Sequence, residues 1–302
     1  MNSHLKSLLR PLSPMQRKTD WAIAIYTGPS PFQLTAPAQI KNPVLTCRSV
    51  TDARARFIAD PFMLYDAGMW YLFAEIYNVG TRKGEIALAT SPDGLKWTYR
   101  QIVLAEPFHM SYPHTFKWCD TFYMLVESRT ESIRLYKATV FPYRWEYVKT
   151  LLSGADFMDT SLIRHNGLWW MFTCPSANND ILSLYYAEDL LGPWQSHPAN
   201  PIVSNDARIA RPGGRMITWD DRIFRFAQDD VQHYGHRVWA LEVTRLTPSI
   251  YQERMAMSAP LLEPSGTRWN AQGMHHIDLH QVRHDQWIAC VDGFKLGLCL
   301  KS

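Results

Sequence analysis

A hairpin pattern that recurs about every 50 residues constrains the fold of this chain more than any other feature. In each copy a turn-like step precedes an aromatic or apolar pair that opens a second strand. The pairs are separated by 47 to 63 residues and lie at Trp70-Tyr71, Phe122-Tyr123, Trp169-Trp170, Ile223-Phe224 and Gln286-Trp287. Units of four strands with this period are typical of propeller blades. The five copies therefore predict an all-β, five-bladed β-propeller with four-stranded antiparallel blades.

The last copy is short of an outer strand, and the apolar segment 21–26 can supply it and close the ring. We therefore expect a single propeller domain over residues 21–302. Residues 1–20 are basic and contain Pro11 and Pro14, so we expect a flexible N-terminal arm. No helix longer than a turn or two is expected. The tryptophans at 97, 145 and 194 recur at equivalent outer positions, which indicates a packing role.

Composition excludes several classes of function. A formal net charge of +3 on 302 residues is too small to indicate a nucleic-acid partner or an anionic membrane surface. No apolar run approaches the roughly 20 residues of a membrane span, and the N-terminus lacks the apolar core of a signal peptide. The five cysteines are scattered and show no CxxC spacing, so we expect reduced thiols in a cytoplasmic protein.

Polar residues follow the two strand ends that a propeller directs to one mouth of its central channel. Counting back from each pair places carboxylates where the innermost strands begin or the second strands end, and we predict catalytic roles for Asp60, Glu127 and Asp159. The other candidates belong to the same ends or lie beside them, and we predict that they bind substrate: Glu75, His109, Tyr112, His114, Arg211, Arg215, Gln228, Asp229 and His276.

Simpler interpretations exist for each residue taken alone. A single Asp before a strand is more often a turn or cap residue than a catalyst. The histidines have no zinc-type spacing, so each is better explained as a core or channel-wall residue, and we predict neither a metal site nor a cofactor. The sequence leaves open whether a cation occupies the central channel.

The segment Ala59-Asp60-Pro61 and its hairpin resemble the first blade of the five-bladed glycosidases of the arabinanase, levansucrase and invertase superfamily. This resemblance implies that Asp60 is the active-site base or nucleophile. Family 43 members of that superfamily also place an Asp in the second blade and an acidic Glu in the fourth. In this chain those places are taken by His114 and approximately by Gly213.

A more extensive resemblance covers residues from about 55 to 280. It is carried by motifs such as His109-Met110-Ser111-Tyr112-Pro113, Gly213-Gly214-Arg215 and Arg225-Phe226-Ala227-Gln228-Asp229. Together they resemble the N-terminal propeller of plant glucosamine inositolphosphorylceramide transferases and of bacterial relatives. In the plant proteins a separate C-terminal domain is expected to transfer the sugar. The bacterial relatives suggest surface-polysaccharide or glycoconjugate metabolism.

These observations leave the question of catalysis open between two main hypotheses. In the first, the propeller is a glycosidase or transglycosidase, with Asp60 as base or nucleophile and Glu127 or Asp159 as acid, since glycosidic cleavage generally needs two carboxyl groups. His114, Arg211 and Arg215 would then orient hydroxyls or an anionic substituent. In the second, it is a non-catalytic carbohydrate-binding propeller that assists a glycosyltransferase or formyltransferase partner. A structural interaction platform ranks third.

Overall fold

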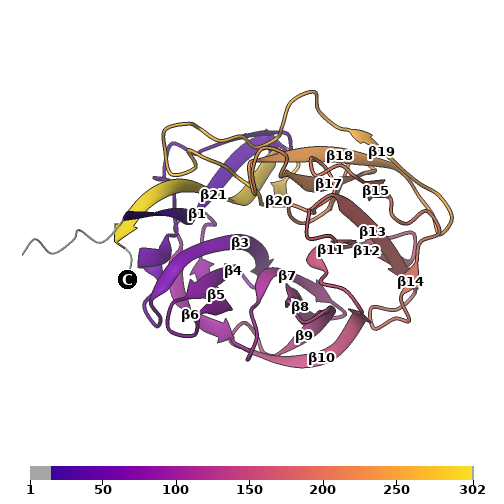
Figure 1. Cartoon of the computed structure of the whole chain (residues 1–302), viewed down its shortest axis with the longest axis horizontal. Coiled ribbons are helices and arrows are strands. Elements are labelled where there is room, and N and C mark those ends of the chain that lie inside the picture. The colour runs from indigo at the N-terminus through magenta and orange to yellow at the C-terminus, as the bar shows by residue number, and fades with distance from the viewer. Residues whose placement is uncertain (1–14, 301–302) are drawn as a thin grey trace, which may run out of the picture.

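Five antiparallel sheets surround a central axis in the computed structural model, which describes residues 15–300 of the chain and side chains within residues 19–297 (Figure 1). Helical structure in residues 15–300 is limited to a 3₁₀ turn at Cys47–Ser49. The predicted five-bladed, all-β propeller is confirmed. Within the same residues, no helix combines the length and the hydrophobicity that a membrane crossing requires.

The blades follow one another along the chain, each beginning at the axis. The first blade consists of β3 (Ala55–Asp66), β4 (Met69–Asn78), β5 (Lys83–Ser91) and β6 (Thr98–Leu104). The second consists of β7 (Ser111–Trp118), β8 (Thr121–Glu127), β9 (Ser132–Val140) and β10 (Arg144–Ser153). The third consists of β11 (Met158–His165), β12 (Leu168–Cys174), β13 (Ile181–Ala187) and β14 (Gln195–Ser196), with β15 (Val203–Ser204) also paired to β13. The fourth consists of β16 (Ile217–Trp219), β17 (Arg222–Asp229), β18 (Arg237–Leu246) and β19 (Tyr251–Met255).

The fifth blade joins the two ends of the described chain. Its strands, from the axis outward, are β20 (Ile277–Arg283), β21 (Gln286–Leu300), β1 (Met15–Ser30) and β2 (Gln33–Thr35). The expectation that residues 21–26 close the ring is confirmed, because β1 pairs with β21. Residues 15–20, which we assigned to the N-terminal arm, pair with β21 as well. The rest of that arm, residues 1–14, lies outside the described residues.

Apolar faces of neighbouring blades pack against each other and form the core. Phe73, Ile86 and Leu88 of the first blade, for example, are buried against Met124 and Tyr136 of the second. Each of these positions was part of an apolar strand pattern in the sequence.

The recurring outer tryptophans also pack between blades. The indole Nε1 atoms of Trp97, Trp145 and Trp194 donate hydrogen bonds to carbonyls three or four residues earlier, at 2.9, 3.0 and 3.2 Å. The same local hydrogen bond from an indole to a carbonyl thus stabilises the outer turn of each of the first three blades.

Candidate active site in the central cavity

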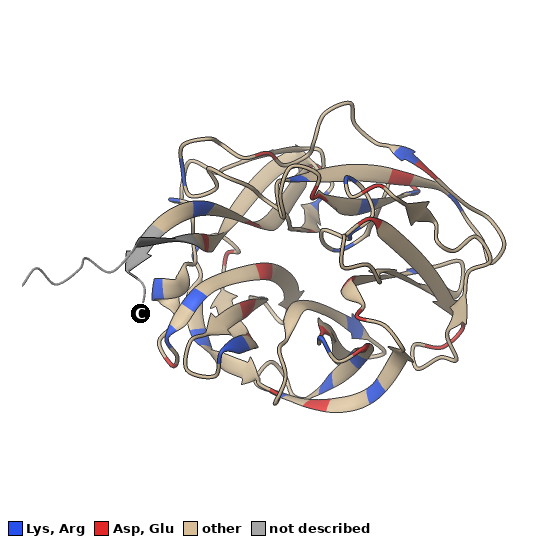
Figure 2. Ribbon diagram, in the orientation of Figure 1, with Lys and Arg blue, Asp and Glu red and all other residues tan. Residues whose placement is uncertain are grey.

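The innermost strands of the first three blades share a backbone irregularity near their beginnings. Their pairing with the second strand shifts just after Ala59, Ser111 and Met158. The next residue in each case has a positive φ, of 53° at Asp60, 49° at Tyr112 and 51° at Asp159. Non-glycine residues rarely adopt this conformation, and it concentrates at functional sites. In Figure 2, acidic positions are visible on segments that surround the axis, including β3 and β11.

A cavity of about 900 Å³ opens at this end of the propeller. The structure brings together five of the residues that we selected from the sequence, because Asp60, Glu75, His109, Glu127 and Arg211 all line this cavity. One wall is apolar and is formed by Trp21, Phe57, Phe294 and Leu296, while Arg129, Thr130 and Asn179 belong to a polar wall.

Asp60 lies next to a buried His–Asp pair. Its backbone N–H donates to Oδ2 of Asp292 at 2.9 Å, and its Oδ2 accepts from the N–H of Tyr112 at 3.3 Å. Nε2 of His275 is 3.5 Å from Oδ1 of Asp60, and Nδ1 of the same ring is 2.7 Å from Oδ1 of Asp292. Burial raises the pKa of Asp60 to about 7, although His275 acts in the opposite direction. Burial disfavours a charged His275, but Asp292 and Asp60 raise the pKa of this imidazole to about 9.

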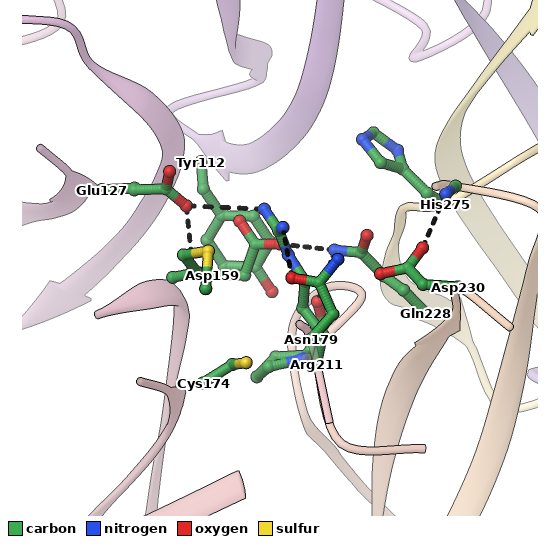
Figure 3. Close-up of polar contacts among 12 residues, drawn as sticks. Tyr112, Glu127, Asp159, Cys174, Asn179, Arg211, Gln228, Asp230 and His275 are labelled. Carbon is green, nitrogen blue, oxygen red and sulfur yellow. Dashed lines mark hydrogen bonds and ion pairs between the residues drawn. The ribbon is translucent and has the colours of Figure 1, made fainter. Parts of the chain in front are cut away.

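A second network connects Arg211 to two carboxylates. Its Nε donates to Oδ2 of Asp159 at 2.5 Å, and its Nη2 is 3.7 Å from Oε2 of Glu127. Its Nη1 donates to Oδ1 of Asn179 at 3.0 Å. Figure 3 shows these side chains converging with Gln228, whose amide also donates to Asp159. Burial and the neighbouring Asp159 raise the pKa of Glu127 to about 8, while Arg211 opposes the shift.

Glu75 occupies the position in the first blade that Glu127 occupies in the second. Glu75 pairs with Ala59 across β3 and β4, and Glu127 pairs with Ser111 across β7 and β8. Burial, and then the negative charges of Asp60 and Glu127, raise the pKa of Glu75 well above its usual value. The equivalent residue of the third blade is Cys174, whose thiol has a pKa raised to about 11 by burial.

Several predicted substrate-binding residues and one predicted catalytic residue do not line the cavity. They are Tyr112, His114, Asp159, Arg215, Gln228, Asp229 and His276. Arg215 donates to Oδ1 of Asp278 at 2.6 Å and to the carbonyl of Thr115 at 2.8 Å, so its guanidinium joins blades. Tyr112 Oη contacts Ser161 Oγ at 2.8 Å and accepts from Gly214 N at 2.7 Å. Asp229 accepts from Trp239 Nε1 at 3.0 Å. The polar groups of Arg215, Tyr112 and Asp229 are therefore bound within the protein. Their positions give no support to the predicted contacts with substrate.

His114 and His276 are buried against Phe62, with ring centroids 5.0 and 4.6 Å away. Within the described part of the chain, Nδ1 of His114 and both nitrogens of His276 have no hydrogen-bond partner. Burial lowers the pKa of His276 to about 4 and that of His114 well below its usual value, so both rings are neutral at pH 7. A neutral imidazole can serve as a metal ligand, but these two rings alone do not decide the question of a channel cation, which the sequence leaves open.

Sequence reasoning missed Asp292 as a site residue, and it interpreted His275, like the other histidines, as a core or channel-wall residue. Ligand atoms of Asp60, His275 and Asp292 lie within 4.8 Å of one another, which is close enough to hold a metal ion. The 2.7 Å contact between His275 and Asp292 is, however, a normal hydrogen-bond length, and it explains their proximity without a metal. Asn179 was also missed, because it lies in the loop between β12 and β13, where no strand pattern marks it.

Comparison with known proteins identifies a matching family. The family described as "Glucosamine inositolphosphorylceramide transferase 1, N-terminal" matches residues 15–294. Glucosamine inositolphosphorylceramide transferase 1 of Oryza sativa subsp. japonica is 34% identical over 297 residues, which cover 90% of this chain and 40% of that protein. The protein of the same name from Arabidopsis thaliana is 31% identical over 296 residues, which cover 90% of this chain and 39% of that protein. The chain therefore spans only about 40% of the length of these relatives.

Solved structures with the same fold include glycoside hydrolases. The catalytic domain of the GH62 α-L-arabinofuranosidase of Coprinopsis cinerea superposes with a TM-score of 0.60 at 12% identity, covering 92% of this chain and 98% of that one. A mutant of the α-L-arabinanase of Cellvibrio cellulosa superposes with a TM-score of 0.56 at 17% identity, covering 79% of this chain and 90% of that one. At these identities the similarity shows a shared fold.

Proposed function

This chain belongs to the family of the N-terminal region of glucosamine inositolphosphorylceramide transferase 1, and from this premise we propose that it is a glycosidase or transglycosidase acting on a glycoconjugate sugar. One observation carries the proposal: three buried carboxyl groups of the first two blades, Asp60, Glu75 and Glu127, line a single cavity. Glycosidic cleavage uses two such groups, one of them kept protonated by its surroundings.

In this reaction Asp60 is the base or the nucleophile. Its neighbour His275 carries a positive charge that stabilises the carboxylate form, and Asp292 holds the imidazole in place. With a pKa of about 7, Asp60 is partly ionised at neutral pH. The proton donor is then another carboxylic acid of the cavity wall, Glu75 or Glu127. Asp159 serves instead to hold Arg211 and Gln228.

The walls of the cavity favour an amphipathic substrate. The side chain of Arg129 is 71% exposed and is available to an anionic group, because the carboxylate oxygen beside it, Oε1 of Glu127, is 3.9 Å away. The apolar wall formed by Trp21, Phe57, Phe294 and Leu296 suits a hydrocarbon or an apolar sugar face. The relatives are named for an inositolphosphorylceramide, and we infer a sugar linked to a phosphorylated lipid as the substrate class.

The proposal is tested by incubating the purified chain and its Asp60→Asn variant with glycosylated inositolphosphoryl lipids and measuring released sugar by mass spectrometry. We expect release by the wild type and a loss of at least about 10²-fold in the variant. Thermal-shift binding of the same lipid should survive in the variant. Undiminished release by Asp60→Asn would refute the role of Asp60. Binding without release by the wild type would support the carbohydrate-binding alternative.

A further inference from the structure

Glu75 has one carboxyl oxygen that is bound to nothing in the described part of the protein. Its side chain is only 7% exposed and lines the cavity, yet among the described residues Oε1 has no hydrogen-bond partner. A buried carboxylate normally has its oxygens paired with donors, because an unpaired charge is costly to bury. This arrangement suits the neutral acid, because a protonated carboxyl group carries no charge that needs a partner.

His109, the polar residue beside Glu75, brings no positive charge that would favour ionisation of the Glu75 carboxyl group. Nε2 of His109 is 3.6 Å from Oε1 of Glu75, while Nδ1 of His109 accepts a hydrogen bond from the N–H of Gly84 at 2.9 Å. An accepting Nδ1 places the ring proton on Nε2. Burial lowers the pKa of His109 to about 4, and this imidazole is therefore uncharged beside Glu75 at neutral pH.

Glu127 differs in the neighbours of its two oxygens. Oε2 accepts the N–H of Asp159 at 3.2 Å and is 3.7 Å from the guanidinium of Arg211. Hydrogen-bond donors and positive charges at such distances stabilise a carboxylate. Arg129, whose guanidinium is 3.9 Å from Oε1 of Glu127, also lowers the pKa of Glu75 and does not distinguish the two residues. Both glutamates have raised pKa values, but among the described residues Glu127 has a hydrogen-bond donor and the buried Arg211 beside it and Glu75 has neither, so Glu75 more readily stays protonated.

We propose that Glu75 is the general acid of the site, taking the part that the missing fourth-blade glutamate plays in family 43 propellers. This inference rests on the proposed function and assigns its proton donor. The geometry behind it is the place of Glu75 in the cavity wall, the buried and unpartnered Oε1 of its carboxyl group, the ring nitrogen of His109 that accepts from Gly84, and the contacts that Glu127 makes with Asp159 and Arg211.

Glu75 donates its proton while the glycosidic bond is cleaved. As the bond between the anomeric carbon and the glycosidic oxygen breaks, its electron pair stays on that oxygen, which takes the proton of Glu75. The carboxylate of Asp60 either forms a bond to the anomeric carbon or removes a proton from the water that does so. The leaving group departs as a neutral alcohol. If Asp60 has bonded to the sugar, Glu75 then removes a proton from a water that displaces Asp60 from the anomeric carbon, which restores both groups. If Asp60 has activated the water instead, it releases that proton to bulk water and Glu75 takes one from bulk water.

The first test compares leaving groups. Glu75→Gln should lower cleavage of an alkyl glycoside about 10²–10³-fold. Its cleavage of a dinitrophenyl glycoside of the same sugar should stay within about tenfold of wild type, since this phenolate leaves without a proton. Asp60→Asn should lose both activities. Equal losses of Glu75→Gln on the two substrates would overturn the donor role, as would a leaving-group dependence that appears in Glu127→Gln instead. A wild type that cleaves neither substrate would overturn the proposed function and the donor role with it.

The second test needs no activity. The infrared spectrum of the wild type at pH 7 should contain a carbonyl stretch of a protonated carboxylic acid that is lost in Glu75→Gln. Glu85→Gln is the matched control, because Glu85 is buried in the same blade but both of its oxygens accept hydrogen bonds, from Asn78 at 2.9 Å and Thr81 at 2.7 Å. A difference spectrum without this band would show an ionised Glu75 and overturn the proposal, whether or not a substrate is known.

Discussion

Nδ1 of His275 lies 2.7 Å from Oδ1 of Asp292, and both side chains are buried. Asp292 lies in the middle of β21 and accepts the backbone N–H of Asp60 in β3, while His275 lies just before β20. The charge of the imidazolium is therefore held between two carboxylates that come from opposite ends of the sequence.

Asp292→Asn should destabilise the fold strongly, because it leaves a buried imidazolium without its closest partner. Removing one member of a buried ion pair typically costs about 3–5 kcal/mol. Urea denaturation at pH 7 would measure this loss, and NMR titration should find a lower pKa for His275. Asp285→Asn is the control: Asp285 is exposed, and its replacement should change stability by less than about 0.5 kcal/mol. A loss below about 1 kcal/mol in Asp292→Asn would contradict the charged pair.

The stability of the protein should fall as the pH rises from about 6.5 to 9. Folding raises the pKa of Asp60 from 3.8 to about 7, of Glu127 from 4.5 to about 8 and of His275 from 6.5 to about 9. Above about pH 6.5 these groups hold protons in the folded chain that the unfolded chain has lost, so the free energy of unfolding decreases with pH. Below that pH the lowered pKa values of His109, His114 and His276 act in the opposite direction. For His275 the contribution is complete below about pH 6.5 and lost as the pH passes about 9.

Urea denaturation in buffers across this range would measure the slope. Glu127→Gln should flatten the profile between about pH 4.5 and 8, since its amide cannot ionise. A profile that is flat or that rises over this range would contradict the assignment of protonated carboxyl groups to the cavity.

The five-bladed fold could be predicted because each blade repeats a local signal. A turn step followed by an aromatic strand start recurs five times, and the segment at Trp21 fills the one missing position. The cavity carboxylates Asp60, Glu75 and Glu127 could be predicted for a similar reason, since each borders the apolar run of a hairpin strand and Glu75 and Glu127 hold equivalent pairing positions.

The direction of the neighbouring side chains could not be predicted in this way. Positive φ values at Asp60, Tyr112 and Asp159 interrupt the alternation of the inner strands, and a single such residue changes which side chains face the cavity. Arg215 consequently binds Asp278 at the axis. Asp292 was missed because it does not mark a strand end: β21 continues through it to Leu300.

Arg211 should contribute more to stability than any exposed arginine of the cavity. Its side chain is 10% exposed and bound to Asp159, whereas that of Arg129 is 71% exposed. Arg211→Met leaves Asp159 buried without its cation and should cost about 3–5 kcal/mol. Arg129→Met should cost less than about 1 kcal/mol, the usual range for an exposed pair. Urea denaturation of both variants at pH 7 makes the comparison, and similar losses would show that the buried network is not what stabilises this rim.

Gly84→Ala should disturb the site through packing at Glu75. A Cβ at Gly84 would clash with the carbonyl oxygen of Met110 and would lie 2.6 Å from Oε1 of Glu75 and 2.8 Å from Cε1 of His109. Overpacking of this kind costs about 1–3 kcal/mol, and the displaced Glu75 should lower any cleavage activity in parallel. At Gly80 a Cβ would meet only Oδ1 of Asn78, at 3.3 Å. Gly80→Ala should therefore stay within about 0.5 kcal/mol of wild type. Thermal and urea denaturation of the two variants measure the difference, and equal stability would mean that β5 can move away from Glu75 and His109 at no cost.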